Sequence, residues 1–264
     1  MRTVLVTLFV SLSVLNSFSA EKLGLPLRQT HAHNDYEHTH PLLDALGQGF
    51  TSVEADIYLV DGQLLVAHER KDVKPERTLQ KLYLEPLRDL VAKNHGSVYP
   101  NGAKIILLID VKTEAERTYA ALKPVLKEFQ AMLTRFTKDK IETNAVTVIL
   151  SGERPRESLL AETDRRAAYD GRLSDLGKGL PIAFMPLVSD SFAARFPSAK
   201  NGELSASDQK AFEHAIQQAH EEGRAIRFWA TNDDRETWKM LRHAGVDFIN
   251  TDDLAGLAAF LRKR

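Results

Sequence analysis

Short apolar segments that end in polar residues alternate with helix-like segments along the chain, and this alternation limits the possible folds more than any other feature. Most of these apolar segments begin roughly 25 to 40 residues apart, as in repeated strand–helix units around a parallel sheet. Eight candidates predict an α/β fold of the TIM-type (β/α)8 barrel kind. The expected strands are Arg28–Thr30, Ser52–Ile57, Gln63–Ala67, Ile105–Val111, Val146–Ser151, Ile182–Pro186, Ala225–Ala230 and Phe248–Thr251.

The third candidate strand, Gln63–Ala67, has a second interpretation. Val60, Asp61 and Gly62 form a short turn with a glycine just before it, a pattern that joins antiparallel strands. The segment therefore either takes its own place in the barrel or pairs back on Ser52–Ile57 as a hairpin.

Helical periodicity is clear in six segments, and no repeat, low-complexity tract or linker divides the chain. We therefore expect a single barrel domain over residues 21–264. The stretch Arg154–Gly179 has weak periodicity and is rich in Arg, Asp and Gly, which predicts a long loop at the barrel mouth or side. The expected helices are Leu42–Leu46, Leu79–Lys93, Glu114–Arg135, Ser207–Glu222, Arg235–Ala244 and Leu254–Lys263.

Residues 1–20 have the pattern of a secretory signal peptide. Arg2 precedes an apolar run from Val4 to Leu15, and a stretch with small residues follows up to Ala20. The run is shorter than the roughly 20 residues that span a bilayer, so we expect cleavage rather than a retained anchor. This predicts an exported protein, periplasmic or secreted, with no membrane span after cleavage.

Composition argues against some partners and sites. With 35 basic and 36 acidic residues, no overall charge attracts nucleic acid, so nucleic acid is not an expected partner. The chain has no cysteine, which excludes disulfides and thiolate metal sites. The sequence does not predict an oligomeric state.

Acidic residues end two of the predicted strands in pairs that share a face. Residues i and i+2 of a strand point the same way, so Glu54 projects beside Asp56, and Asp110 beside Lys112. Barrel enzymes build their sites at the carboxyl ends of strands, where both pairs would face one cavity. Three converging carboxylates repel one another unless a cation neutralises them, and oxygen ligands suit Mg²⁺ or Ca²⁺. A divalent metal site is therefore expected; the alternative is solvated acids or partners of nearby Lys and Arg.

Histidines also follow predicted strands. His31 and His33 come directly after the first strand, and His68 follows Gln63–Ala67. A lone histidine in such a place is more often structural than catalytic. Beside a hard metal, however, two imidazoles form an acid–base pair that moves protons near neutral pH.

The order of these residues resembles the glycerophosphodiester phosphodiesterase and phosphatidylinositol-phospholipase-C-like superfamily. Barrels of that superfamily carry a first-strand His, a Glu-x-Asp pair, a second His and an acid-x-Lys pair, which correspond to His31, Glu54 and Asp56, His68, and Asp110 and Lys112. The closing region, Phe228–Asn232 and Gly245–Asp252, is similar as well. Within the superfamily, the group named for altered inheritance of mitochondria looks most similar, through His31–Tyr36, Pro41–Leu46 and Arg77–Leu87.

Two departures from the superfamily's usual pattern bear on the substrate. Glycerophosphodiesterases usually begin His-Arg-Gly and continue with Pro-Glu-Asn-Thr, whereas this chain has His31-Ala-His33 and no Pro-Glu-Asn-Thr. Asp110 stands where those enzymes usually have Glu, a feature shared with spider-toxin-like phospholipase D barrels. The resemblance therefore predicts the class of reaction more specifically than it predicts the substrate.

The resemblance implies a phosphoric diester hydrolase that acts on a small glycerophosphodiester-like or phospholipid-derived substrate. In such an enzyme Glu54, Asp56 and Asp110 would hold the metal ion, and Lys112 would neutralise the phosphate. His31 and His68 would act as general base and general acid, often through a neighbouring substrate hydroxyl that attacks to give a cyclic phosphate. Asn34 would donate a hydrogen bond to a phosphate oxygen. Trp229 would form the floor of the pocket or belong to the core. His33 would be a metal ligand, a second base or a structural support.

Two other functions stay open. The pair His31-x-His33 also opens zinc amidohydrolase barrels, but that chemistry needs more histidines at later strand ends. The remaining candidates fall in helical or loop segments: His95, His214, His220 and His243. The second alternative is a non-catalytic exported barrel that binds a metal and an anion without turnover.

Overall fold

The computed structural model describes residues 23–138 and 140–263. The predicted signal peptide lies outside the described residues, so the signal and the expected export stay predictions. Within the described ranges, no helix combines the length and the apolar character needed to cross a membrane.

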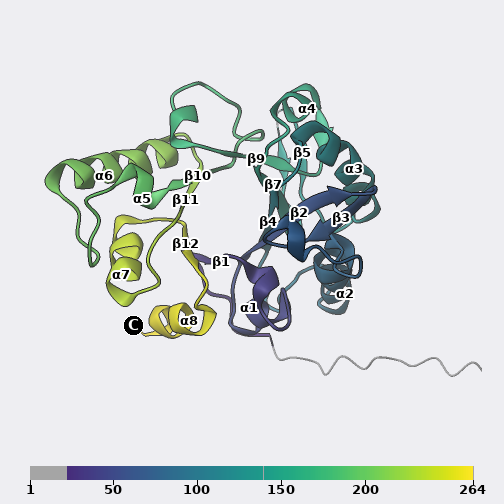
Figure 1. Cartoon of the computed structure of the whole chain (residues 1–264), viewed down its shortest axis with the longest axis horizontal. Helices are drawn as coiled ribbons and strands as arrows, with labels where there is room; N and C mark the ends of the chain where they lie inside the picture. The colour runs from purple at the N-terminus through teal and green to yellow at the C-terminus, as the bar shows by residue number, and fades with distance from the viewer. Residues whose placement is uncertain (1–22, 139, 264) are drawn as a thin grey trace, which may run out of the picture.

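Eight parallel strands of the described chain form a closed ring, which confirms the predicted single-domain TIM-type barrel (Figure 1). The ring closes because Ala32 is in register with Thr251 of the last strand and with Val53 of the second. In ring order the strands are β1 (Thr30–Ala32), β2 (Ser52–Val60), β4 (Ile105–Val111), β7 (Val146–Gly152), β9 (Ala168–Gly171), β10 (Leu187–Ser191), β11 (Ala225–Trp229) and β12 (Phe248–Thr251).

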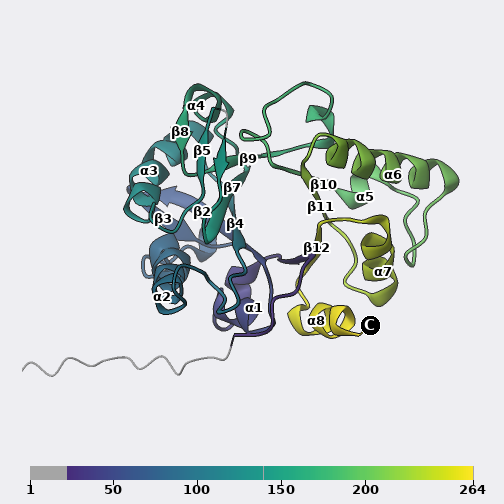
Figure 2. The ribbon, with the colours of Figure 1, turned by 180° about the vertical axis from the view of Figure 1, so that it is seen from behind.

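Helices surround the ring on its outside, as the two opposite views show (Figures 1 and 2). The last helix lies beside the first, where Arg262 donates a 2.9 Å hydrogen bond to the carbonyl of Gln48. The α-helices are α1 (Leu43–Gly47), α2 (Glu85–Lys93), α3 (Ala115–Glu128), α4 (Arg156–Ala161), α5 (Phe192–Arg195), α6 (Ala206–Glu221), α7 (Arg235–Ala244) and α8 (Leu254–Arg262). Shorter helical turns are η1 (Asp35–Glu37), η2 (Arg70–Asp72), η3 (Gln80–Leu84) and η4 (Leu173–Asp175).

The third strand, β3 (Gln63–Val66), stays outside the ring and pairs antiparallel with β2. The hairpin interpretation is therefore the correct one. The turn at Asp61 and Gly62 has positive φ at both residues, the geometry that matches the twist of a tight hairpin. Because β3 runs backwards, its end returns to the level of Asp56, where the amide of Ala67 donates to the carbonyl of Asp56 at 3.3 Å.

Two predictions are wrong in the middle of the chain. The stretch Arg154–Gly179 is not a plain loop, because it contains α4 and the ring strand β9. The expected strand Ile182–Pro186 does not form, and the next ring strand begins at Leu187. Proline lacks the N–H that a strand ladder needs, and Pro181 and Pro186 stand at both ends of that segment.

A small three-stranded sheet lies outside the barrel and also differs from expectation. It consists of β5 (Arg135–Thr137), β6 (Ile141–Glu142) and β8 (Asp164–Arg165). The helix expected over Glu114–Arg135 therefore ends at Glu128. The first ring strand starts at Thr30 rather than at Arg28.

The barrel interior is apolar at one end and polar at the other. Leu108, Ile149 and Leu187 pack together in a cluster separate from the main core. The residues two positions later on the same strands point to the same side and are polar: Asp110, Ser151 and Ser189. The apolar cluster therefore closes the barrel beneath a polar layer at the carboxyl ends of the strands, which we call the mouth.

Candidate active site

Three carboxylates converge at the mouth. Glu54 and Asp56 project from β2, and Asp110 of β4 is the register partner of Asp56. One oxygen atom of each lies within 4.8 Å of the other two. The ammonium of Lys112 sits 2.9 Å from Asp56 Oδ2 and 2.9 Å from Asp110 Oδ1. The two i, i+2 pairs therefore converge on one site, as their spacing predicts.

The crowding of these acids is visible in their pKa values. Burial and the charge of Glu54 raise the pKa of Asp56 to about 6, against the opposing charge of Lys112. Burial also raises the pKa of Asp110. Burial alone would lower the pKa of Lys112, but the charges of Asp110 and Asp56 outweigh it and raise that pKa. Lys112 therefore offsets only part of the repulsion that Asp56 experiences from its neighbouring acids.

The donor set fits a hard divalent cation. Asp56 Oδ1 is buried and has no hydrogen-bond partner among the described residues, although a buried carboxylate oxygen normally has one. It belongs to the cluster whose other members are also carboxylates, and oxygen-only ligation suits Mg²⁺ or Ca²⁺. A cation beside Asp56 would satisfy this atom.

Glu54 is held by two buried basic groups. Its Oε2 accepts a 2.7 Å hydrogen bond from Arg227 and lies 2.9 Å from His31 Nε2. Burial would raise the pKa of Glu54, but Arg227 and His31 hold it well below its usual range. Arg227 comes from β11, across the ring closure, and also donates to Asn250 at 3.1 Å. Glu54 is therefore ionised and fixed in orientation.

His31 is a buried, neutral imidazole. Its Nδ1 lies 2.7 Å from the Ser52 hydroxyl, and its Nε2 faces Glu54 and Arg227. Burial and the nearby guanidinium of Arg227 lower the pKa of His31 to about 3. Near neutral pH this imidazole is uncharged, and both of its ring nitrogens have close polar partners.

His68 reaches the mouth from outside the ring because the β2–β3 hairpin folds back. The Tyr36 hydroxyl connects it to the acids: this oxygen lies 2.6 Å from Asp56 Oδ2 and 3.0 Å from His68 Nδ1. His68 Nδ1 is itself 3.4 Å from Asp56 Oδ2. More than half of the His68 side chain, 56 %, remains exposed, so this imidazole can exchange protons with substrate or solvent.

His33 and Asn34 lie at the rim of the mouth. Asp252 Oδ1 is 2.8 Å from His33 Nδ1 and 3.3 Å from Asn34 Nδ2. Burial would lower the pKa of His33, but the hydrogen bond to Asp252 and the charge of Glu54 raise it. The Nε2 of His33 is 3.9 Å from Glu54 Oε1, so this imidazole lies close to one of the predicted metal ligands.

Trp229 stands on the wall opposite the three acids, at the end of β11. Its side chain is half-buried, and the guanidinium carbon of Arg172 lies 4.7 Å from its ring centroid. The Arg227 guanidinium also approaches the ring, at 6.0 Å. Trp229 therefore lies between two arginines at the mouth rather than in the main core.

The predicted site residues lie on ring strands or within two residues after a ring strand or β3, but three of their neighbours were not predicted. Tyr36, Arg227 and Asp252 each bond directly to a predicted residue. Arg227 could have been recognised from the sequence, because it stands two positions before Trp229 on an otherwise apolar strand and so shares its face. For Tyr36 and Asp252 the sequence gives no such indication beyond their place in the family motifs.

The histidines that a zinc amidohydrolase would need are elsewhere. His214 and His220 lie on α6 and His243 on α7, all outside the ring, and His95 follows α2. His220 pairs with Asp247 at 2.8 Å. No second or third histidine from later ring strands joins His31 and His33 in the described residues.

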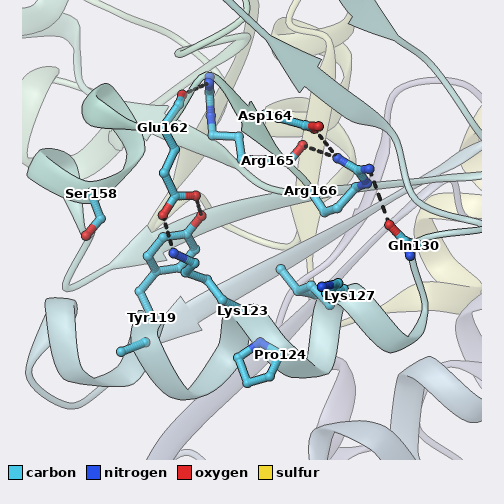
Figure 3. Close-up of a pocket in the computed structure, with 12 residues that line it drawn as sticks. Tyr119, Lys123, Pro124, Lys127, Gln130, Ser158, Glu162, Asp164, Arg165 and Arg166 are labelled. Carbon is cyan, nitrogen blue, oxygen red and sulfur yellow. Dashed lines mark hydrogen bonds and ion pairs between the residues drawn. The ribbon is translucent and has the colours of Figure 1, made fainter.

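A surface cavity of about 500 Å³ lies between α3 and the segment from α4 to β8, and none of the predicted site residues lines it (Figure 3). Several of its charged groups are paired, Lys123 with Glu162 at 2.6 Å and Arg166 with Asp164 at 2.6 Å. The candidate chemistry is therefore at the mouth and not in this cavity.

Sequence comparison identifies relatives of the chain. Residues 24–170 match the AIM6-like phosphodiesterase domain, a range that contains the three acids, His31, His68 and Lys112. Altered inheritance of mitochondria protein 6 homolog from Arthroderma benhamiae is 30% identical over 257 residues, which are 85% of this chain and 81% of that protein. Altered inheritance of mitochondria protein 6 from Eremothecium gossypii is 31% identical over 89% of this chain and 69% of its own length.

Comparison with solved structures supports the fold. A glycerophosphodiester phosphodiesterase from Parabacteroides distasonis superposes with a TM-score of 0.52 at 15% identity, over 90% of this chain and 98% of that one. One from Agrobacterium tumefaciens gives a TM-score of 0.52 at 15% identity, over 88% and 100%. Together with the match to the family's domain, these likenesses show that the chain belongs to the AIM6-like phosphodiesterase family and has the barrel fold of glycerophosphodiester phosphodiesterases.

Proposed function

We propose that this protein is a metal-dependent phosphoric diester hydrolase acting on a small glycerophosphodiester-like or phospholipid-derived substrate. One observation supports it above the others. Three carboxylates of a phosphodiesterase-family barrel converge within 4.8 Å around a lysine, and one buried oxygen of Asp56 lacks a partner. This arrangement suits a divalent cation and a phosphate bound side by side.

Glu54, Asp56 and Asp110 would hold Mg²⁺ or Ca²⁺. A divalent cation at this place supplies charge neutralisation and polarises the phosphoryl oxygens. Lys112 lies between two of the acids and would bind a phosphate oxygen with its ammonium. Asn34 and Trp229, at the rim and on the opposite wall, would hold the rest of the substrate in place.

The two histidines would divide proton transfer between them. His31, whose Nε2 lies 2.9 Å from the metal-binding candidate Glu54, would act as the general base that accepts a proton from the attacking hydroxyl. His68 is exposed and hydrogen-bonded to Tyr36, which suits a general acid that delivers a proton to the leaving oxygen. The attacking hydroxyl would be a neighbouring group of the substrate, with a cyclic phosphate as product, or water.

Hydrolysis of a panel of phosphodiesters by the purified protein tests this proposal. We expect turnover that needs Mg²⁺ or Ca²⁺, stops with a chelator and is lost in His68→Ala. The matched control His40→Ala removes an exposed histidine of the loop after η1 and should keep full activity. If a metal binds at the three acids and no diester is turned over, the chain is a metal- and anion-binding barrel instead.

A further inference from the structure

The mouth contains a second polar network, on the strands that follow β4 around the ring. Asp170 of β9 is fully buried, and both of its oxygens are occupied. The Ser151 hydroxyl donates to Oδ2 at 2.7 Å, and the Ser189 hydroxyl donates to Oδ1 at 2.7 Å. Arg172 adds a 3.0 Å ion pair from Nη1. Strands β7, β9 and β10 thus fix one arginine through a carboxylate that no ligand can reach.

Arg172 is bound along one edge of its guanidinium only. Nη1 donates to Asp170 and to the carbonyl of Gly171 at 2.9 Å. Nη2 makes one long contact, 3.5 Å to Ser151, and Nε makes none within the described residues. The side chain is 20 % exposed and lies over the ring of Trp229. An oriented guanidinium edge with unused N–H donors is therefore exposed at the mouth.

This wall offers donors and almost no acceptors. The carboxylate of Asp170 is saturated, and both serine protons point to it. The indole N–H of Trp229 has no partner in the described part of the chain, and it can only donate. A cationic group is disfavoured on this ring because the Arg172 guanidinium already lies on it. The ligand chemistry that fits is an oxygen acceptor, and an oxyanion fits the fork of an arginine best.

The distance to the acids suits a substrate of modest size. Ser151, which Arg172 approaches, is the register partner of Asp110 on the neighbouring strand. Arg172 follows β9, the next strand of the ring, so it stands about two strand spacings from Asp110, on the order of 10 Å. A phosphate near Asp110 and a second group near Arg172 can therefore belong to one short molecule.

We propose that Arg172, backed by Asp170 and Trp229, binds an oxyanion on the alcohol group of the substrate, a carboxylate or a second phosphate. This inference rests on the proposed phosphodiesterase function and specifies its substrate class. Diesters whose alcohol carries a negative charge are preferred, and diesters of a quaternary ammonium alcohol are poor substrates.

Calorimetric binding of two matched pairs of product-like ligands to the whole protein with Mg²⁺ or Ca²⁺ tests the proposal. O-phosphoserine differs from O-phosphoethanolamine by one carboxylate, and glycerol 1,3-bisphosphate differs from glycerol 3-phosphate by one phosphate. We expect the more charged member of at least one pair to bind about 10- to 100-fold more tightly, the scale of charge-assisted hydrogen bonds. The pair that shows the preference identifies the oxyanion.

Arg172→Gln should abolish that preference and leave the affinity for O-phosphoethanolamine within about threefold. The matched control is Arg195→Gln, which removes an equal charge. Arg195 lies on α5 and pairs with Asp190 of β10 at 2.8 Å. This control variant should keep the preference. Equal affinities within both pairs, or a preference that survives Arg172→Gln, would overturn the proposal. A diester hydrolysis assay run in parallel tests the proposed function separately. Absence of turnover would contradict the proposed hydrolysis, whereas the binding measurements alone test the oxyanion site.

Discussion

At the scale of single residues, Asp35 shows how a buried acid supports the first segment of the site. It is fully buried, accepts from the Leu42 amide at 2.6 Å and the Tyr83 hydroxyl at 2.8 Å, and its Oδ1 has no hydrogen-bond partner among the described residues. Leu42 has φ of 67°, a left-handed value that a branched side chain adopts only under constraint. Asp35 therefore holds the strained turn that follows His31 and Tyr36.

Asp35 predicts a dependence of stability on pH. Burial raises its pKa to about 7, against the opposing hydrogen bonds, so the folded protein keeps a proton that the unfolded chain has lost above about pH 4. The free energy of unfolding should fall between about pH 4 and pH 7, by at most about 1.4 kcal/mol per pH unit from this group. Asp35→Asn keeps the acceptor and lacks the titration, so it should lose less stability between pH 5 and pH 8 in urea unfolding. Parallel pH profiles of the two proteins would contradict this.

Tyr36 predicts a specific loss of activity. Tyr36→Phe removes the hydroxyl that bonds both Asp56 and His68. Because Asp56 keeps Lys112 and His68 loses its orientation, we expect a fall of about 10- to 100-fold in kcat with metal affinity nearly unchanged. The control is Tyr99→Phe, whose hydroxyl bonds the carbonyl of Phe50 at 2.6 Å in the core. A similar fall in both variants would indicate a general loss of packing.

The sequence predicted those site residues whose spacing along a strand places them on one face. Glu54 with Asp56 and Asp110 with Lys112 were accessible because the period of a strand puts i and i+2 on one face. Arg227 and Trp229 obey the same rule, but only Trp229 was recognised, through the family resemblance. Tyr36 was not identified because its partners Asp56 and His68 come from other strands, and Arg172 was not identified because its strand β9 was not predicted.

At the scale of elements, the turn after β7 shapes the metal site. Gly152 has φ of 66°, and a Cβ atom built there would lie 2.3 Å from Asp110 Oδ1 and 2.4 Å from the carbonyl of Val111. Cβ atoms essentially never approach other heavy atoms this closely, so a larger residue here would force the Asp110 carboxylate or the Val111 backbone to shift. The end of β7 is thus a part of the site although it contributes no ligand.

Gly152→Ala should therefore weaken metal binding. The added methyl pushes the Asp110 carboxylate away from Asp56, and we expect at least a tenfold loss in affinity for Mg²⁺ or Ca²⁺ by calorimetry. The matched control is Gly179→Ala, where φ is 67° and no atom lies within 4 Å of the built Cβ. It shares the backbone strain without the collision. Equal metal affinity in the two variants would show that Asp110 is not a ligand.

The elements themselves were predictable where a continuous apolar run or a clear helical periodicity formed them. Strand β4 and helix α7 have the bounds expected from the sequence. Strand β9 was missed because its four residues, Ala168 to Gly171, include a charged interior position and give no clear pattern. Its place in the ring comes from pairing with β7 and β10, which is a property of the whole barrel rather than of the segment.

At the scale of the whole molecule, the barrel brings residues from both ends of the chain to one site. His31 of β1 and Arg227 of β11 meet at Glu54 of β2, next to the strand pair that closes the ring. The acids repel one another, since burial and neighbouring carboxylates raise the pKa values of both Asp56 and Asp110. A bound ion should therefore stabilise the entire fold.

This coupling predicts a metal-dependent melting temperature. A ligand at 100 times its Kd adds about 2.7 kcal/mol to the free energy of unfolding, which for a chain of this size raises Tm by roughly 5 to 10 °C. We expect that rise with saturating Mg²⁺ or Ca²⁺ by calorimetric scanning, and its reversal by a chelator. Asp110→Asn should show little of it. An equal rise in that variant would place the stabilising ion elsewhere.

The central claim is that a divalent ion held by Glu54, Asp56 and Asp110 is required for phosphodiester hydrolysis. The most direct test removes all metal with a chelator, titrates Mg²⁺ or Ca²⁺ back, and records bound metal and diester turnover in the same sample. We expect turnover to rise in proportion to bound metal, to saturate near one ion per chain, and to be absent in Asp110→Asn. Full turnover in the chelated protein, or a filled site without turnover of any diester, would contradict it.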